Sequence, residues 1–307
     1  MSARETAGAP ELPAERDAHG AAPHEGRSTP RRCYLVCATQ RSGSTLLCET
    51  LEATGVAGVP REYFEELKET GISRRPREYF WGLRSPEVLR LLPAESQLDR
   101  ESERRASWSR DDYAAHFNAA LGAGTTPNGV FGAKLMWSYF PDFLELMRGI
   151  PRFAGMGDGS LLNAAFPELS YVFVSRSDKV RQAVSLWRAL QTWVWRKSSG
   201  APPEETLLER QIVYSFDAID HLLDQLRRQE DAWRGFFFRI GQRPLPLYYE
   251  EVASDPDAAV ARVLDVLEIP SEHAAPPAPR QIGRQSDEIS ESWVQSYLED
   301  ASRRWRV

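Results

Sequence analysis

The amino-acid sequence predicts an α/β fold in which a mostly parallel central sheet is flanked by helices in three layers. Short runs of β-forming residues alternate along the chain with longer amphipathic stretches of helical period. Such alternation builds parallel strands joined by right-handed helical crossovers. The first run, residues 33–38, also passes through a polar turn directly into a helix. A chain of 307 residues is long enough to bury a full core.

Residues 1–30 are predicted to form a disordered tail, and residues 31–307 a single α/β domain. The first 30 residues are rich in Ala, Pro, Gly and charge and lack an amphipathic period. The formal net charge of −6 argues against a nucleic-acid partner. No apolar run approaches the roughly 18–20 residues of a membrane span, and no signal-peptide core precedes the domain. We therefore expect a cytoplasmic protein without a membrane span.

The elements are predicted in order from their spacing and their terminators. A strand over 33–37 leads to a helix from Ser44 to Ala53, which Gly55 ends. Val56–Val59 follows as a short second strand or an extended segment. The later predicted elements are helical pieces within 85–125, a buried strand at 130–137, a glycine-containing loop over 150–167, a strand at 171–174, a helix from 175 to about 195, a helix over 215–240, a short strand at 244–249, a helix from Asp255 and a final helix over 288–304.

The polar turn between the first strand and the first helix has the features of an anion site. Its backbone N–H groups and those of the first helical turn point at one spot, where the helix dipole favours negative charge. A nucleoside-triphosphate loop would carry Lys after its last glycine, but Ser44 follows Gly43 here. The turn is predicted to hold a phosphate-like group without that lysine or the usual magnesium; an ordinary capped turn is the alternative. The candidate donor side chains are Arg41, Ser42, Ser44 and Thr45.

The cysteines do not indicate a metal site or a disulfide framework. Cys33, Cys37 and Cys48 are an odd number without Cys-x-x-Cys spacing, and the five histidines are scattered. We therefore expect structural thiols and no bound metal.

The string Gln40–Leu47 resembles the 5′-phosphosulfate loop of sulfotransferases, and the whole chain is most similar to the mycobacterial trehalose 2-sulfotransferase family. Colinear matches run from about Tyr34 to the final helix. The resemblance implies a P-loop-like, sulfotransferase-type fold and a homodimer. It also implies 3′-phosphoadenosine-5′-phosphosulfate as the sulfuryl donor. The matching segments outside the loop are Ala53–Gly58, Thr126–Val130, Lys134–Trp137, Gln182–Ser185, Gln191–Thr192 and Val194–Arg196.

Two glutamates are candidates for the base that sulfuryl transfer to a hydroxyl requires. The pentapeptide Pro-Arg-Glu-Tyr-Phe occurs at 60–64 and again at 76–80, and either copy could start a helix. A carboxylate after the second strand would lie at the carboxyl edge of the sheet, where ligands bind. This favours Glu62, which also falls on the family's general-base position, and leaves Glu78 as a helix cap.

The resemblance implies an acceptor pocket around Glu62. Aromatic residues at this spacing are otherwise more often core, and Lys134 in a buried strand is equally compatible with a structural ion pair. In the family a second acid precedes the base by three residues, and Val59 stands there in this chain. An apolar side chain cannot hydrogen-bond a sugar hydroxyl. The residues implied in the pocket are Gln40, Val59, Arg61, Glu62, Tyr63, Phe64, Tyr79 and Lys134.

Arg176 and Ser185 are implied to hold the donor's 3′-phosphate. Sulfotransferases use an Arg at such a strand end and a Ser in the next helix, and the planar guanidinium suits a phosphate. An Arg ion pair and a helix-packing Ser are the structural alternative.

The function implied is a sulfotransferase of the EC 2.8.2 type acting on a hydroxyl of a carbohydrate or glycolipid precursor. Glu62 takes the acceptor proton, while Arg41 and the N–H groups of Gly43, Ser44 and Thr45 stabilise the developing charge. A natural-product hydroxyl as acceptor, a P-loop kinase and a nucleotide-sensing module are the alternatives.

Overall fold

A parallel sheet forms the centre of the molecule, as the sequence predicts. The computed structural model describes residues 30–93, 109–192, 212–270 and 288–304. Within them, four parallel strands lie in the order β2-β1-β3-β4. The first three strands are buried beyond their first residues, as expected when helices cover both faces. The strands are β1 (Arg32–Ala38), β2 (Val130–Met136), β3 (Leu169–Ser175) and β4 (Leu245–Tyr248).

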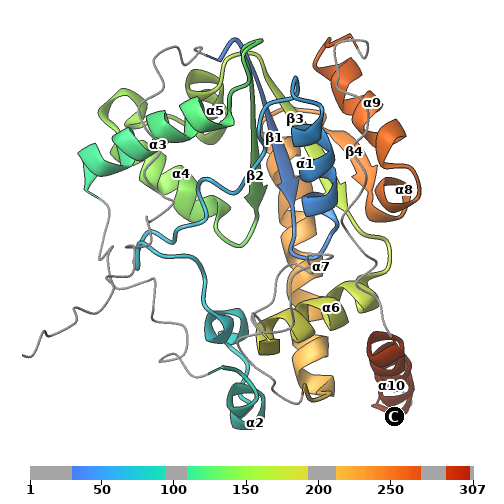
Figure 1. The fold of residues 1–307 in the computed structure, drawn as a ribbon. Helices are drawn as coiled ribbons and strands as arrows, with labels where there is room; N and C mark the ends of the chain where they lie inside the picture. The colour runs from blue at the N-terminus through green and yellow to red at the C-terminus, as the bar shows by residue number, and fades with distance from the viewer. Residues whose placement is uncertain (1–29, 94–108, 193–211, 271–287, 305–307) are drawn as a thin grey trace, which may run out of the picture.

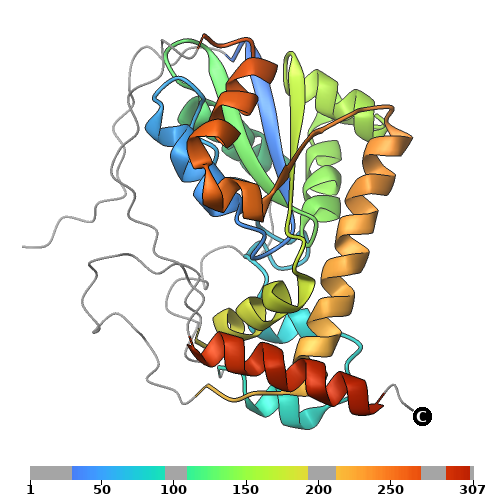
Figure 2. The same ribbon diagram turned by 90° about the vertical axis from the view of Figure 1, so that its right-hand side faces the viewer.

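Helices cover both faces of the sheet, which gives the predicted three layers (Figures 1 and 2). On one face lie α1 (Ser44–Ala53), α8 (Tyr249–Ser254) and α9 (Pro256–Val266), which pack on one another. On the other face lie α4 (Phe140–Gly149), α5 (Asp158–Ala165) and the C-terminal half of α7 (Phe216–Arg239). Helix α3 (Arg110–Gly124) packs against β2 and α4.

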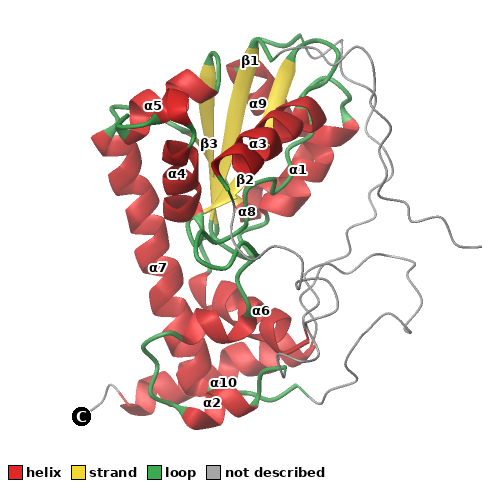
Figure 3. Cartoon of the chain, turned by 90° about the vertical axis from the view of Figure 1, so that its left-hand side faces the viewer, coloured by secondary structure: helices red, strands yellow, loops and turns green. Residues whose placement is uncertain are grey.

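A second hydrophobic cluster lies beyond the carboxyl ends of the strands (Figure 3). It is built by η1 (Pro76–Phe80), α2 (Pro86–Arg90), α6 (Lys179–Thr192), the N-terminal half of α7 and α10 (Glu288–Arg304). Trp187 in this cluster is fully buried, with its ring edge-on to Phe80. The C-terminal half of α7 contributes Trp233 and Phe236 to the sheet core instead. One helix therefore takes part in both clusters.

The strand order places a switch point between β1 and β3. Strand β1 lies between β2 and β3, so the connections leaving β1 and β3 run in opposite directions and open a crevice at their carboxyl ends. The register pairs Ala38 with both Met136 and Val174, so the three strands end nearly level. The polar turn after β1 and the turns after β2 and β3 therefore start from one edge.

Two stretches differ from the sequence prediction. The predicted loop over 150–167 contains a 3₁₀ turn, η3 (Pro151–Phe153), and the helix α5. Its glycines lie at the ends of these elements, while Leu161 and Leu162 are fully buried and give α5 its inner face. The short strand or extended segment predicted at 56–59 is replaced by bends and irregular backbone, with φ 71° at Gly58, so no second strand precedes Glu62. The sheet pairing of residues 56–64 is one isolated bridge, Arg61 with Ala133. The first copy of the pentapeptide therefore does not start a helix.

The other predicted elements agree with the structure within a few residues, α1 and α10 at both ends. Helices α4 and α8 were not predicted. The three cysteines are buried, free thiols, as expected. No described helix has the length and apolar character needed to cross a bilayer. The predicted tail falls outside the described residues except for Pro30, and so does the predicted end of α6 near residue 195.

Candidate active site

The turn after β1 has a conformation that requires glycine at its end. Gly43 is the N-cap of α1 and has φ 83°. A Cβ atom at Gly43 would lie 2.3 Å from Cδ2 of Tyr249. The carbonyl of Ala38, the last residue of β1 before the turn, accepts bonds from the Trp233 indole at 2.8 Å and from the backbone N–H of Trp137 at 3.1 Å. The turn is thus fixed at its base and closely covered at its tip.

Positive side chains converge beside this turn. Arg41 Nε donates to Ser185 Oγ at 2.9 Å, which joins the turn to α6. Burial, together with the charges of Arg176 and Arg188, lowers the pKa of Arg41 to about 10. Burial also lowers the pKa of Arg176, whose guanidinium lies 4.5 Å from the centre of the Tyr249 ring. Like charges held this close favour a bound anion between them.

Two buried donors in this cluster have no hydrogen-bond partner in the described structure. They are Arg176 Nε and Ser42 Oγ. Buried polar atoms are nearly always paired, so unpaired donors beside a predicted anion site are compatible with a ligand oxygen there. The residues implied to hold a phosphosulfate donor therefore fit an anion with oxygen acceptors.

Lys134 joins the anion turn to Glu62. The Lys134 side chain is nearly buried in the middle of β2. Its ammonium lies 2.8 Å from Glu62 Oε1 and donates to Thr45 Oγ1 at 3.1 Å. The Tyr139 hydroxyl donates to Glu62 Oε2 at 3.0 Å. Lys134 was expected either to line the pocket or to make a structural ion pair. In the structure it makes an ion pair with Glu62 and also lies beside the anion turn.

Gln40 and Tyr79 lie on the same side of the turn. Gln40 is buried, donates to the Ser138 hydroxyl and hydrogen-bonds the Tyr79 side chain. The Arg74 guanidinium lies 5.7 Å from the centre of the Tyr79 ring and donates to the Ser138 carbonyl at 2.8 Å. The structure thus gathers Gln40, Glu62, Tyr79 and Lys134 around one region of polar side chains.

Glu65 adds a second carboxyl group to this region. Burial, and then the negative charge of Glu62, raise the pKa of Glu65 to about 7, although a hydrogen bond to Ser73 opposes the shift. The Glu65 carboxyl group therefore holds its proton more tightly than an exposed glutamate does.

Sequence reasoning missed several of these residues. Ser138 and Tyr139 follow a buried strand directly, so the carboxyl-edge rule could have found them. Glu65 is three residues from the proposed base. Arg74 lies in an irregular segment without a periodic signal.

Other predicted pocket residues have different surroundings. Phe64 is fully buried, with its ring centre 4.9 Å from that of Phe143, so it supports the site from the core instead of lining it. The exposed Arg61 guanidinium pairs with Glu52 on α1. The Tyr63 hydroxyl donates to the Val59 carbonyl at 2.7 Å.

The second glutamate of the repeated pentapeptide is a cap, as predicted. Glu78 Oε2 accepts a bond from the backbone N–H of Arg75 at 2.6 Å, at the start of η1. This carboxylate is therefore occupied by the local turn.

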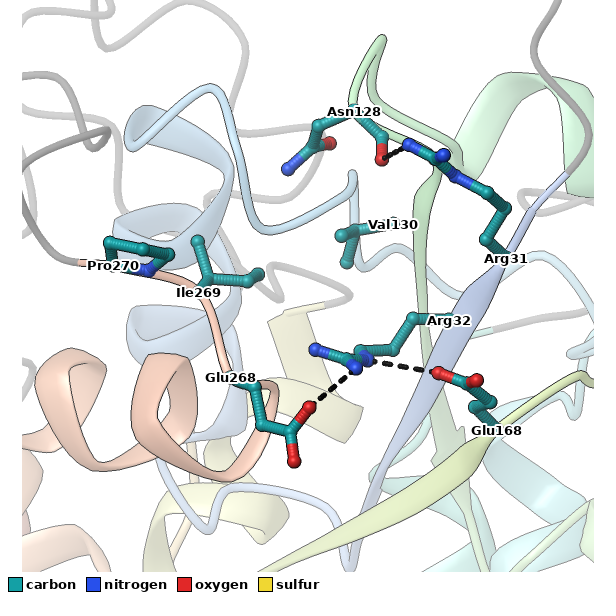
Figure 4. Close-up of a pocket in the computed structure, with 9 residues that line it drawn as sticks. Arg31, Arg32, Asn128, Val130, Glu168, Glu268, Ile269 and Pro270 are labelled. Carbon is teal, nitrogen blue, oxygen red and sulfur yellow. Dashed lines mark hydrogen bonds and ion pairs between the residues drawn. The ribbon is translucent and has the colours of Figure 1, made fainter.

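A separate pocket lies at the opposite, amino-terminal edge of the sheet (Figure 4). Its centre is Arg32, which pairs with Glu168 and Glu268. None of the predicted site residues lines it.

An anion turn at the switch point of a parallel sheet, with a carboxylate held beside it, is the arrangement of a group-transfer enzyme. The chain belongs to the Stf0 sulphotransferase family, whose sequence profile matches residues 33–300. The chain is 38% identical over 273 residues to a trehalose 2-sulfotransferase of Mycobacterium tuberculosis, covering 89% of this chain and 96% of that protein. It is 36% identical over 271 residues to the trehalose 2-sulfotransferase of Mycolicibacterium smegmatis, covering 88% and 96%. A solved sulfotransferase from Mycobacterium avium gives a TM-score of 0.40 at 14% identity, covering 89% of this chain and 69% of that one.

Proposed function

We propose that this enzyme moves a sulfuryl group from 3′-phosphoadenosine-5′-phosphosulfate to a hydroxyl of a trehalose-like carbohydrate, with Glu62 as the general base. The observation that carries the proposal is the position of Lys134, which contacts Glu62 and Thr45 at once. A proton-accepting carboxylate and an anion turn are thereby held within reach of one ammonium group. Sulfuryl transfer requires these two parts side by side.

The donor would be held by the residues around the anion turn. Arg41 and the backbone N–H groups of Gly43, Ser44 and Thr45 would bind the phosphosulfate, and Arg176 and Ser185 the 3′-phosphate. The unpartnered Ser42 Oγ and Arg176 Nε support this assignment because each needs an oxygen acceptor.

Glu62 would remove the proton from the acceptor hydroxyl. The acceptor oxygen forms its bond to sulfur as the bond from sulfur to the 5′-phosphate oxygen breaks. Lys134 and Tyr139 orient the Glu62 carboxylate before transfer. Once Glu62 carries the proton, its attraction for Lys134 weakens, and the ammonium can turn toward the charge that develops at the anion turn.

The acceptor is proposed from the relatives, both of which are called trehalose 2-sulfotransferases. Glu65, Arg74 and Gln40 supply polar groups beside Glu62 that suit a polyhydroxyl substrate. Val59 supplies none, which favours a related disaccharide or a natural-product hydroxyl as the second candidate. We further propose that residues 31–307 act as one domain of a cytoplasmic homodimer.

Calorimetry without magnesium tests the donor site. Wild-type protein should bind 3′-phosphoadenosine-5′-phosphate, the product nucleotide, more tightly than ATP or AMP. Incubation with the sulfuryl donor and trehalose, followed by mass spectrometry, should then show a sulfated disaccharide. A preference for ATP would instead support the P-loop kinase alternative. Donor binding with no sulfation of any sugar would leave the nucleotide-sensing alternative.

A further inference from the structure

We infer that Gln182 is a positioning residue that holds the two ends of the donor site in register. The inference rests on the proposed function, because it assigns the turn after β1 and the start of α6 to the two phosphates of one donor. Gln182 belongs to neither predicted phosphate site. It lies between them, and its side-chain amide contacts both.

The Gln182 side chain is fully buried in α6 and bonds the anion turn directly. Its Nε2 donates to the Gln40 carbonyl at 2.7 Å and to the Thr39 hydroxyl at 2.9 Å. The Gln40 carbonyl belongs to the peptide unit that precedes Arg41. Since that unit is planar, the Gln182 amide fixes its orientation from the side of α6.

This constraint explains how Arg41 keeps an unusual backbone conformation. Arg41 has φ 62°, in the left-handed region that non-glycine residues rarely enter. Such a conformation persists where the surroundings over-determine it. The Gln40 carbonyl bond on one side, and the bond from Arg41 Nε to Ser185 on the other, provide two such constraints from one helix.

The other end of the Gln182 amide leads to the 3′-phosphate residues. Lys179, one turn earlier in α6, donates to Gln182 Oε1 at 3.3 Å and to the carbonyl of Arg176. Ser185 lies one turn later on the same helix. A continuous set of hydrogen bonds therefore runs from the anion turn, through Gln182 and Lys179, to the backbone of Arg176.

Register matters for a ligand that reaches both sites and not for a ligand that fills one. Without the Gln182 amide, the turn can shift relative to α6 and still bind a single phosphate. A nucleotide with both phosphates must bring the turn back into place, and the free energy that this requires weakens its binding.

The test compares Gln182→Met with Gln191→Met. Gln191 is a matched control because it is also buried in α6, and its amide also bonds a backbone, that of Val213, at 2.8 and 3.1 Å. Calorimetry would measure 3′-phosphoadenosine-5′-phosphate, 5′-AMP and 3′-AMP on wild-type protein and both variants. For Gln182→Met we expect the bisphosphate to lose about tenfold or more in affinity. The loss for 5′-AMP should be smaller, because Gln182 also constrains the Arg41 backbone within the turn, and 3′-AMP should change less than about threefold. Gln191→Met should leave the ratios as in wild type.

The outcomes separate this inference from the proposed function. An equal loss for all three ligands, or the same selective loss in Gln191→Met, would overturn the role of Gln182 and leave the donor site intact. A wild-type protein that does not prefer the bisphosphate would overturn both. Gln182→Glu serves as a second variant, since its carboxylate can pair with Lys179 but cannot donate to Gln40. If neither Gln182 variant folds while Gln191→Met does, Gln182 is a core residue and the inference is wrong.

Discussion

The ammonium of Lys134 lies 2.8 Å from the carboxylate of Glu62, and the side chains are only 6% and 26% exposed. Removal of one partner from such a pair leaves an uncompensated charge in a poorly solvated place. Loss of one partner should therefore destabilise the fold, and different substitutions separate this effect from the proposed catalytic role of Glu62.

Substitution of the proposed base should remove catalysis and spare the donor site. Glu62→Gln keeps the shape of the side chain but accepts no proton, so kcat should fall by ~10²–10⁴-fold. Affinity for 3′-phosphoadenosine-5′-phosphate should stay within a few-fold of wild type. Glu78→Gln is the matched control, because the same pentapeptide surrounds it and its carboxylate only caps η1. Full activity in Glu62→Gln would show that another group is the base.

Substitution of Lys134 should destabilise the fold through the charge it leaves behind. Lys134→Met should lower the free energy of unfolding by on the order of 3 kcal/mol. Urea denaturation measures this quantity. Because Glu62→Gln removes the stranded charge, the double variant should be more stable than Lys134→Met alone. Additive losses in the double variant would mean that the two side chains do not interact energetically.

The pH dependence of stability should report Glu65. Burial and the charge of Glu62 raise the pKa of Glu65 from 4.5 to about 7 in the folded chain. The folded state then binds this proton more tightly than the unfolded state. Protonated Glu65 therefore adds to the free energy of unfolding below pH 4.5, and this contribution is lost as the pH rises through 7. Thermal unfolding from pH 5 to 8 should show a smaller decline for Glu65→Gln than for wild type. The exposed Glu69→Gln should follow the wild-type curve.

Substitution of Gly43 should weaken donor binding because of Tyr249. Gly43→Ala places a Cβ atom 2.3 Å from the Tyr249 ring, at φ 83°. We expect at least a tenfold loss in affinity for 3′-phosphoadenosine-5′-phosphate, since the turn must move to relieve the contact. Gly155→Ala measures how much a positive φ alone costs in free energy of unfolding, because Gly155 has φ 73° and open space around it. If Gly43→Ala loses no more stability than Gly155→Ala, the steric explanation is wrong.

The sequence specified the sheet and the anion turn more completely than the acceptor side. The run at β1, the turn and α1 are continuous in the chain, so spacing alone placed Arg41 to Thr45 together. Phe64 and Tyr63 could not be told apart, because alternation in an irregular segment does not show which ring turns inward. Arg74 and Tyr139 reach the site from separate segments, and such long-range contacts leave no local pattern. Gln182 was visible only as part of a matched segment, and its partners became evident in three dimensions.

The participation of α7 in both hydrophobic clusters limits how the chain can be divided. Its 24 residues extend about 36 Å, with Trp233 bonded to the base of the anion turn and Leu222 packed in the second cluster. A fragment that ends before Phe216 would lack the buried α7 side chains that pack in both clusters. Neither the sheet core nor the second hydrophobic cluster can therefore be excised as a self-sufficient unit, and we expect the two to have been inherited together.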